Sequence, residues 1–323
     1  MIPIGVLVAP HRSSPGHPSD RPIGRAALAL RARGVDVVFG HVAVHGRLTG
    51  VRATPDGWAT AEAIPIVAAY DRFPSQTRPD DWRTLAAGLE GVPLANPEPL
   101  VLLCRDKVAC QRVLEGAGLR LPPLCDAHTH FAAAVQRWGA AFLKPRYGAF
   151  GRGVQRVLPG DVLPCRGEGA VPGIEDPLFV QQAVPPLDGW AGVSLRVNAQ
   201  RLPDRSWHVN TPVVRRSRTD PVVNASRGAE VASADAVFPG LSGVIRAQVR
   251  DVAVALSAQP EGALLVELGV DVVISAEHEP WVIEVNSRPR GRLEALAALD
   301  PCWESAHLEA VCRPIETLAA WFG

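Results

Sequence analysis

The chain has 323 residues, of which 47% are hydrophobic and 20% charged, a balance typical of a globular protein with two or three domains. Its 33 basic and 33 acidic residues cancel, so there is no overall positive field to hold nucleic acid or an anionic membrane. No apolar run reaches the roughly 18–20 residues of a membrane span. The six cysteines are scattered without a CxxC motif, and we therefore expect reduced thiols and a cytoplasmic location.

The predicted elements indicate an α/β protein with three parts. In the first part, up to residue 98, the strand-helix-strand pattern at the start predicts a βαβ unit of a parallel sheet. The expected elements there are strand 2–9, helix 23–33, strands 35–39 and 64–69, helix 79–89 and the short edge strand 92–96. The second part, residues 99–184, is expected to contain helices 105–117 and 127–138 and strands 141–144, 154–158 and 178–182. The third part, residues 185–323, is expected to contain strands 193–199, 206–214, 270–275 and 280–286 and helices near 241–257 and 304–321.

Only two of the 33 basic residues are lysines, Lys107 and Lys144. A GC-rich coding bias replaces lysine by arginine wherever a guanidinium serves, so a surviving lysine indicates a place that needs a compact ammonium. Chance survival on the surface is the alternative for either lysine.

A glycine loop follows Lys144. Its glycines, Gly148, Gly151 and Gly153, allow backbone N–H groups to approach an anion without interference from a Cβ atom. The GxxGxG spacing between two strands is not the dinucleotide fingerprint, and no GK[ST] marks a P-loop. Most such loops are simple turns, so it is the nearby lysine that makes this loop a candidate polyphosphate site.

The last two predicted strands form a hairpin that carries three oxygen ligands. Symmetry about Glu277-His278 places Asp271 opposite Glu284, with Asn286 on the same face. Facing carboxylates repel one another and require a counter-ion, and carboxylate and amide oxygens suit Mg²⁺. A solvent-facing polar row is the alternative.

An arginine-rich stretch runs from Arg196 to Arg227. Arg196 lies in the middle of a predicted strand, where a guanidinium costs free energy unless it meets an anion. We expect most of the other arginines of this stretch on the solvated surface.

Taken in order, these elements resemble the ATP-grasp superfamily, most closely its YheC/YheD endospore-coat-associated branch, which is related to RimK-like and glutathione-synthetase-like ligases. The resemblance covers about residues 64–298, and the Trp281 block is its most specific part. It rests on Tyr70-Asp-Arg-Phe-Pro, Asn96-Pro, Asp106-Lys107, Leu143-Lys-Pro-Arg-Tyr-Gly-Ala-Phe-Gly-Arg-Gly-Val, Leu195-Arg-Val, Asn224-Ala-Ser-Arg-Gly, Val266-Glu-Leu-Gly-Val-Asp and Trp281-Val-Ile-Glu-Val-Asn-Ser-Arg-Pro. It implies an α/β ATP-grasp fold with an N-terminal βαβ pre-ATP-grasp substrate domain (1–98), a small central lid domain (99–184) and a C-terminal mixed-sheet catalytic domain (185–323).

The resemblance also implies roles for individual residues. The implied nucleotide-binding residues are Lys107, Lys144, Gly148, Gly151, Gly153 and, in the hinge that reads adenine, Gln181, Gln182 and Val184. The implied metal ligands are Asp271, Glu284 and Asn286, and the implied catalytic residues are Arg196, Lys144, Arg216, Asn224 and Arg227. ATP and two Mg²⁺ ions, with Mn²⁺ as a substitute, are the implied cofactors. Ser194 stands where the family often has an acidic residue, and Arg288 where it commonly has lysine, so substrate specificity is not carried over.

The function implied is that of an ATP-dependent carboxylate–amine ligase, which forms amide or peptide bonds through an acyl phosphate. Its substrates are a small molecule or peptide that carries a carboxylate, and an amine acceptor. Three alternatives stay open: a peptide-macrocyclising ester or amide ligase, a small-molecule kinase, and a non-catalytic nucleotide-binding structural protein. Nucleic acid and membrane are not expected partners, and homo-oligomerisation is left open.

Overall fold

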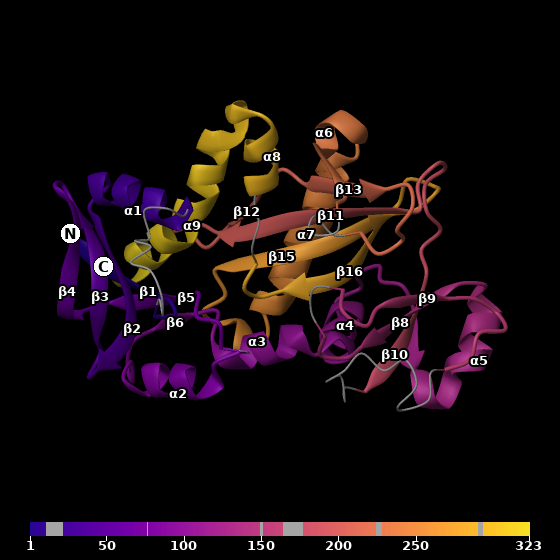
Figure 1. The fold of residues 1–323 in the computed structure, drawn as a ribbon, viewed down its shortest axis with the longest axis horizontal. Coiled ribbons are helices and arrows are strands. Elements are labelled where there is room, and N and C mark those ends of the chain that lie inside the picture. The colour runs from indigo at the N-terminus through magenta and orange to yellow at the C-terminus, as the bar shows by residue number, and fades with distance from the viewer. Residues whose placement is uncertain (11–21, 76, 149–150, 164–176, 224–227, 290–292) are drawn as a thin grey trace.

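The computed structural model describes the whole chain except residues 11–21, 76, 149–150, 164–176, 224–227 and 290–292. Three β-sheets follow one another along the chain, and helices cover them (Figure 1). We call them the N-terminal sheet, the central sheet and the C-terminal sheet. Within the described residues, no helix combines the length and the apolar character that a bilayer crossing requires.

The N-terminal sheet has the strand order β4-β3-β2-β1-β5-β6. Strand β1 pairs in parallel with both β2 and β5, which confirms the predicted βαβ unit. Strands β3 and β4 were not predicted, because their few large apolar residues give a weak alternating pattern. The elements of this part are β1 (Ile2–Leu7), α1 (Pro22–Ala32), β2 (Val35–Val44), β3 (Arg47–Thr54), β4 (Gly57–Pro65), β5 (Ala68–Asp71), α2 (Pro79–Ala87) and β6 (Leu94–Ala95).

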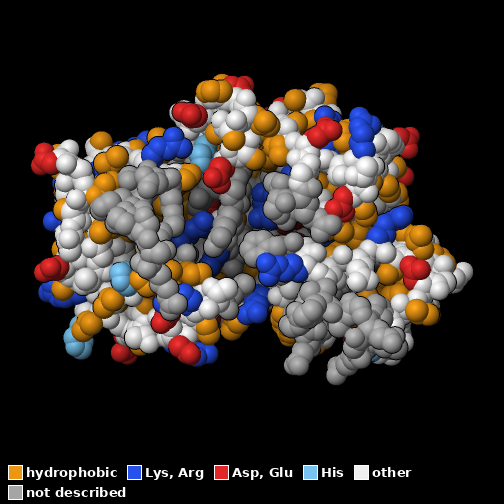
Figure 2. Space-filling model, viewed as in Figure 1, with side chains coloured by type: hydrophobic (Ala, Val, Ile, Leu, Met, Phe, Trp, Pro, Cys, Tyr) orange, Lys and Arg blue, Asp and Glu red, His pale blue; other side chains and the backbone are white. Residues whose placement is uncertain are grey.

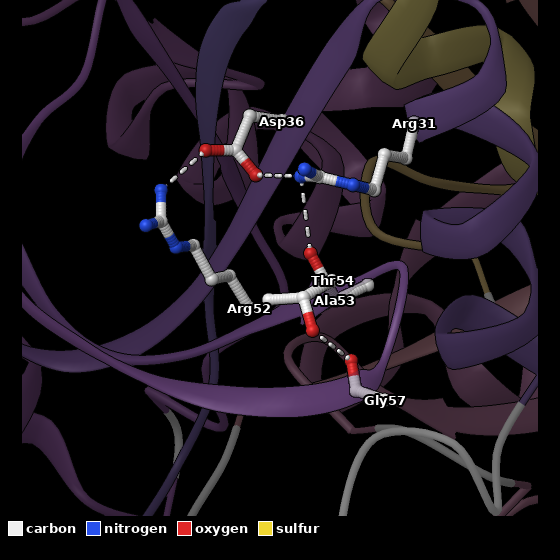
Figure 3. Close-up of polar contacts among 6 residues, drawn as sticks. All are labelled: Arg31, Asp36, Arg52, Ala53, Thr54 and Gly57. Atoms are coloured by element: carbon white, nitrogen blue, oxygen red, sulfur yellow. Dashed lines mark hydrogen bonds and ion pairs between the residues drawn. The ribbon is translucent and has the colours of Figure 1, made fainter.

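A buried carboxylate attaches β3 to the βαβ unit (Figure 3). Asp36 of β2 accepts hydrogen bonds from Arg31 of α1 at 3.4 Å and from Arg52 of β3 at 3.0 Å. Arg31 also donates to the carbonyl of Ala53 at 3.2 Å. Because a buried charge is costly without partners, this arrangement fixes helix and strands in one geometry.

The central sheet has the order β7-β10-β8-β9 and is covered by α5 (Ala127–Trp138). Helix α5 begins where Asp126 caps the N–H of Thr129 at 2.9 Å and ends at Gly139, which adopts a φ of 72°. The apolar residues between helix and sheet form a small core of their own. The strands are β7 (Leu124–Asp126), β8 (Ala141–Pro145), β9 (Gln155–Val157) and β10 (Leu178–Gln182).

The C-terminal sheet has the order β14-β13-β11-β15-β16, with β12 paired to β11. The single strand expected over 206–214 is two strands, and Pro212 between them has no N–H to donate to the ladder. The strands are β11 (Gly192–Arg201), β12 (Trp207–Val209), β13 (Val213–Ser217), β14 (Glu230–Ser233), β15 (Glu267–Ile274) and β16 (Pro280–Asn286). The helices after residue 230 are α6 (Ala234–Val237), α7 (Ser242–Ser257), α8 (Glu294–Leu299) and α9 (Glu304–Phe322), with 3-10 turns at Pro260–Gly262 and Pro301–Trp303.

The α3–α4 segment and helix α9 do not pack on the sheet of the part in which the sequence placed them. Helices α3 (Glu98–Arg105) and α4 (Lys107–Gly116) bury their apolar faces in the core of the C-terminal sheet. They replace the expected helix 105–117, because Asp106 leaves the helical conformation and caps the N–H of Ala109 at 3.0 Å. Helix α9, at the C-terminal end of the sequence, packs on α1 and the N-terminal sheet.

Candidate active site

A cleft of about 1400 Å³ lies among the three sheets and is lined by the ends of β5, β10 and β16, by β8, β11, β13 and β15, and by the start of α4. This volume exceeds that of a typical single-ligand pocket, so the cleft has room for a nucleotide and a second substrate. Figure 2 shows Lys and Arg side chains gathered along the hollow between the N-terminal part and the rest of the molecule.

Both lysines of the chain line this cleft, from different elements. Lys107 is the first residue of α4, and its ammonium donates a hydrogen bond to the carbonyl of Gly148 in the glycine loop. Arg146 tightens the same junction, since its guanidinium donates to both oxygens of Asp106 at 2.7 and 2.6 Å. Burial alone would raise the pKa of Asp106, but the hydrogen bonds from Arg146 and from backbone amides lower it below its usual value.

Lys144 reaches the cleft because of the alternation along β8. Ala141 and Leu143 face the core of the central sheet, so Lys144 faces the opposite side. Its ammonium donates to Oε1 of Gln181 at 2.6 Å, and Gln181 in turn donates to Gln111 at 2.9 Å. Gln181, predicted to bind the nucleotide, is therefore buried beneath Lys144 and orients its ammonium.

The ammonium of Lys144 is held in an environment that disfavours its charge. The pKa of Lys144 is lowered to about 8, chiefly by burial and in part by the nearby Lys107, whereas Glu284 and Asp271 act in the opposite direction. An anion in the cleft would restore the charged form, so the site is prepared for a negatively charged ligand.

The hairpin of β15 and β16 has the register that the sequence predicts at its functional end. Asp271 faces Glu284, and Gly269 faces Asn286. Burial raises the pKa of Glu284; Lys107 opposes this shift, and the facing Asp271 adds to it. The two carboxylates therefore repel one another across the hairpin, as expected.

Near its turn the hairpin differs from the prediction. The turn is centred on Glu277, since Ser275 and Glu279 close it with a hydrogen bond of 2.9 Å, and His278 adopts a φ of 61°. A β-bulge between Asp271 and Val272 then shifts the register by one residue. The symmetry axis assumed in the prediction was therefore wrong, but the one additional residue that β16 has at the bulge restores the predicted pairing of Asp271 with Glu284.

Asp271 is engaged by arginines from two neighbouring strands. Arg196 of β11 donates through Nε and NH2 to the two carboxylate oxygens of Asp271, at 2.8 Å each. Arg215 of β13 lies 3.8 Å from the same carboxylate, and Nδ2 of Asn286 donates to it at 3.3 Å. The anion that mid-strand Arg196 was expected to require is, in this structure, the side chain of Asp271.

Gly269 clears the space that Arg196 occupies. A Cβ atom at position 269 would lie 2.6 Å from Cβ of Pro289 and 3.1 Å from NH1 of Arg196. The first distance is shorter than any van der Waals contact. Only glycine therefore allows Pro289, which follows β16, and the guanidinium of Arg196 to lie so close to position 269. No pattern in the sequence indicates this requirement.

The prediction for Arg216 requires a correction. Arg215, which was not singled out, lines the cleft and faces Ser194 in the register of β13 with β11. Arg216 is outside the set of cleft-lining residues, since successive side chains of a strand alternate between faces. It stacks on Trp190, with 4.4 Å between its Cζ and the ring centroid, and pairs with Glu230 at 3.0 Å.

Other predicted residues fall into three groups. Gly148, Gly151, Gln182 and Val184 line the cleft, while Gly153 is not among its lining residues. Gly151 and Gly153 both have positive φ, 68° and 69°, which explains the need for glycine there. Asn224, Arg227 and residues 149–150 of the glycine loop lie outside the described residues.

Two backbone N–H groups at the end of β10 already donate hydrogen bonds within the protein. The N–H of Gln182 donates to Pro123 at 2.9 Å, and the N–H of Ala183 donates to Ala140 at 3.1 Å. Because neither amide remains free, a ligand that reads this backbone by an N–H group would have to use Val184.

The donor set of the hairpin fits a hard divalent cation. Asp271, Glu284 and Asn286 offer two carboxylates and an amide oxygen on one face of the hairpin. No group of three or more His, Cys, Asp and Glu side chains forms a metal site among the described residues. A cation here would therefore depend on the amide and on ligand oxygens as well, which is typical of Mg²⁺ with phosphates.

Comparisons with known proteins are consistent with this geometry. Residues 174–306 match a family model described as YheC/D like ATP-grasp, whereas a search of curated protein sequences found no match. D-cycloserine synthetase DcsG has a similar structure, with 17% identity, a TM-score of 0.62 and coverage of 99% of this chain and 100% of the other. D-alanyl-alanine synthetase A from Vibrio cholerae is similar over 98% of each chain, with 15% identity and a TM-score of 0.57.

A third similar structure is the ATP-grasp ligase PsnB in complex with a phosphomimetic variant of its minimal precursor, Mg and ADP. It shares 19% identity, has a TM-score of 0.55, and the match covers 98% of this chain and 97% of the other. At such identities the likeness establishes the fold, and it confirms the fold predicted from the sequence. The chain thus has the ATP-grasp fold, and its residues 174–306 match the YheC/D like ATP-grasp model.

Proposed function

We propose that the chain is an ATP-dependent carboxylate–amine ligase that works through an acyl phosphate. The observation that supports this most strongly is the convergence in one cleft of both lysines with Asp271, Glu284 and Asn286. These residues come from two different sheets and from the start of helix α4, and such a mixture of ammonium groups and oxygen ligands suits a metal-bound polyphosphate. The domain roles expected from the sequence, the magnesium ions and the cytoplasmic location belong to the same proposal.

In this proposal the nucleotide lies between the central and C-terminal sheets. Lys107 and Lys144 hold its phosphates from two sides, and the amides of the glycine loop cover them. Val184 supplies the free backbone N–H that reads the base, because the amides of Gln182 and Ala183 are used within the protein. Gln181 holds Lys144 in place.

Asp271, Glu284 and Asn286 would hold Mg²⁺, which when bound neutralises phosphate charge. The residues of the chain supply the remaining electrostatics. Arg196 and Arg215 lie beside Asp271 and carry two positive charges toward the part of the cleft where the substrate carboxylate meets the terminal phosphate. Since charge develops on the transferred group, these fixed cations stabilise the transition state.

The proposed reaction needs no nucleophile from the protein. An oxygen of the substrate carboxylate attacks the terminal phosphorus, the bond to the bridging oxygen breaks, and ADP leaves. The amine nitrogen then attacks the acyl carbon, phosphate leaves, and the nitrogen gives up a proton to solvent. The chain's task is to position both substrates and to stabilise charge.

Hydroxylamine trapping tests this proposal without knowledge of the amine. The protein, ATP and Mg²⁺ are incubated with a panel of carboxylic acids and hydroxylamine, and hydroxamate and ADP are quantified. We expect one class of acids to yield both products in equal amounts. Glu284→Gln should abolish both, whereas Arg83→Gln, a change on the exposed face of α2, should abolish neither.

The same experiment separates the alternatives. ADP without hydroxamate, together with a phosphorylated acceptor, would indicate a small-molecule kinase. Hydroxamate formed only from side chains of a peptide, with loss of water from that peptide when hydroxylamine is omitted, would indicate a macrocyclising ligase. Nucleotide binding without ADP release across the panel would refute the ligase and favour a binding protein.

A further inference from the structure

Two sequence motifs without an assigned role meet at the N-terminal end of the cleft. The first is Tyr70-Asp71-Arg72, at the end of β5, and the second is Ser287-Arg288-Pro289, after β16. Arg288 pairs with Asp71, and NH1 of Arg72 donates to the carbonyl of Pro289 at 2.7 Å. The motifs are more than 200 residues apart in the chain, so only the tertiary fold brings them into contact.

Among the described residues, Asp71 accepts no hydrogen bond from Arg72. Its buried carboxylate accepts hydrogen bonds from Trp82 Nε1 and from the N–H of Phe73, at 2.8 Å each, as well as from Arg288. Arg288 uses its other terminal nitrogen to donate to Ser75 at 2.9 Å. The single negative charge of Asp71 is therefore consumed by Arg288.

Arg72 is a cation that has neutral partners. Its NH1 donates to the hydroxyl of Tyr70 at 3.3 Å and to Pro289, and its guanidinium lies 5.6 Å from the centre of the Tyr70 ring. The Tyr70 hydroxyl in turn donates to Glu267 at 2.5 Å. Arg72 lines the cleft, and both of its hydrogen bonds to described residues use NH1, so Nε and NH2 have no hydrogen-bond partner among the described residues.

The charge of the cleft exceeds what a nucleotide needs. Its described lining holds nine basic side chains and three carboxylates, and Asp71, which is not among the lining residues, offsets the charge of Arg288. Two of the three carboxylates belong to the hairpin. The basic residues are Arg72, Arg105, Lys107, Lys144, Arg152, Arg156, Arg196, Arg215 and Arg288. Magnesium would cancel much of the nucleotide charge, so part of this excess is available to another anion.

We propose that Arg72 binds a second carboxylate of the acid substrate, so that the preferred substrate is a dicarboxylate. This inference rests on the proposed function. One carboxylate is activated beside Arg196 and Arg215, and the other is held at the N-terminal end of the cleft. A planar guanidinium fork matches the two oxygens of a carboxylate and rejects the neutral amide of the same shape.

Matched pairs of acids and amides test this directly. The protein, saturated with ADP and Mg²⁺, is titrated calorimetrically with succinate and succinamate, glutarate and glutaramate, L-aspartate and L-asparagine, and L-glutamate and L-glutamine. Members of each pair differ by one negative charge at nearly equal size. The variants are Arg72→Gln and the control Arg83→Gln, whose guanidinium pairs with Asp80 at 2.6 Å outside the cleft.

We expect at least one acid to bind the wild type about 10- to 100-fold more tightly than its amide, the value of a charge-assisted hydrogen-bonded pair. Arg72→Gln should bring this ratio close to one, and Arg83→Gln should leave it unchanged. Arg72→Lys serves if the Gln variant does not fold; it keeps the charge but loses the fork, so the ratio should fall at least about threefold. If Arg72 had only a structural role, its replacement would weaken the binding of acids and amides alike.

Two results would overturn the inference: no acid that binds more tightly than its amide in the wild type, or an unchanged ratio in the Arg72 variants. Hydroxamate formation separates this failure from that of the proposed function. Hydroxamate from monocarboxylic acids with no acid–amide preference would leave the ligase intact and remove the second carboxylate site. An acid preference that depends on Arg72, without hydroxamate from any acid, would keep the site and refute the ligase.

Discussion

If the proposed function is right, the ammonium of Lys144 should make nucleotide affinity dependent on pH in a range where few other groups titrate. Burial lowers the pKa of Lys144 to about 8, with Lys107 adding to the shift and Glu284 and Asp271 opposing it. Phosphates bind the charged ammonium, so the affinity for ADP should be highest below this pKa and should decrease as the pH rises through it. About nine-tenths of Lys144 is protonated at pH 7 and about one-tenth at pH 9, so ADP affinity should fall roughly tenfold over this interval.

The assay is calorimetric titration of the protein with ADP and Mg²⁺ at half-unit steps from pH 7 to 9. Lys144→Arg is the matched control, because a guanidinium stays charged throughout this range and ADP itself titrates identically in both experiments. The quantity compared is the slope of log Kd against pH. Equal slopes in wild type and Lys144→Arg would refute the reasoning, whatever the absolute affinities are.

The same lowered pKa predicts an opposite trend for stability. The unfolded chain binds a proton at Lys144 up to its ordinary pKa of 10.5, whereas the folded chain releases it near pH 8. Between these values the unfolded state holds more protons, so the free energy of unfolding should rise with pH. Lys144→Met, measured by chemical denaturation of the ligand-free protein, should lose this rise.

Three further outcomes are expected. Asp271→Asn should lower the free energy of unfolding by about 3 kcal/mol, since it leaves Arg196 without its carboxylate. Glu284→Gln removes a repelled charge and should leave the free energy of unfolding unchanged or raise it. Equal losses of the two variants in denaturant titrations would contradict this. Gly269→Ala should cost about 1–3 kcal/mol and displace Arg196, which thermal unfolding and hydroxamate yield would reveal. Arg216→Gln should leave ADP affinity and hydroxamate yield unchanged, and a large loss of either would return this residue to the site.

Several features of the site follow from patterns within short segments of the chain. Two-residue alternation in β8 puts Lys144 on the face opposite Leu143, and the same alternation brings Asp271, Glu284 and Asn286 to one side of a hairpin. Such features are predictable because a strand or hairpin is decided by residues within about fifteen positions of one another. The βαβ unit and the cap-bounded helix α5 belong to the same class.

Other features depend on which distant segments pack together. Asp271 reads as a free carboxylate in the sequence, but β11 lies beside β15 and gives it Arg196 as a partner. The pairing of β13 with β11 places β13 beside the cleft, and the alternation of side chains along β13 then turns Arg215, and not Arg216, toward it.

The meeting of Arg72 with Pro289 likewise exists only because the N-terminal sheet packs against the end of β16. Composition, spacing and periodicity describe each strand by itself, so they determined the chemistry that each segment carries. The order of strands in a sheet and the packing of one sheet against another arise from contacts between residues far apart in the chain, and these decided which charges of this protein meet.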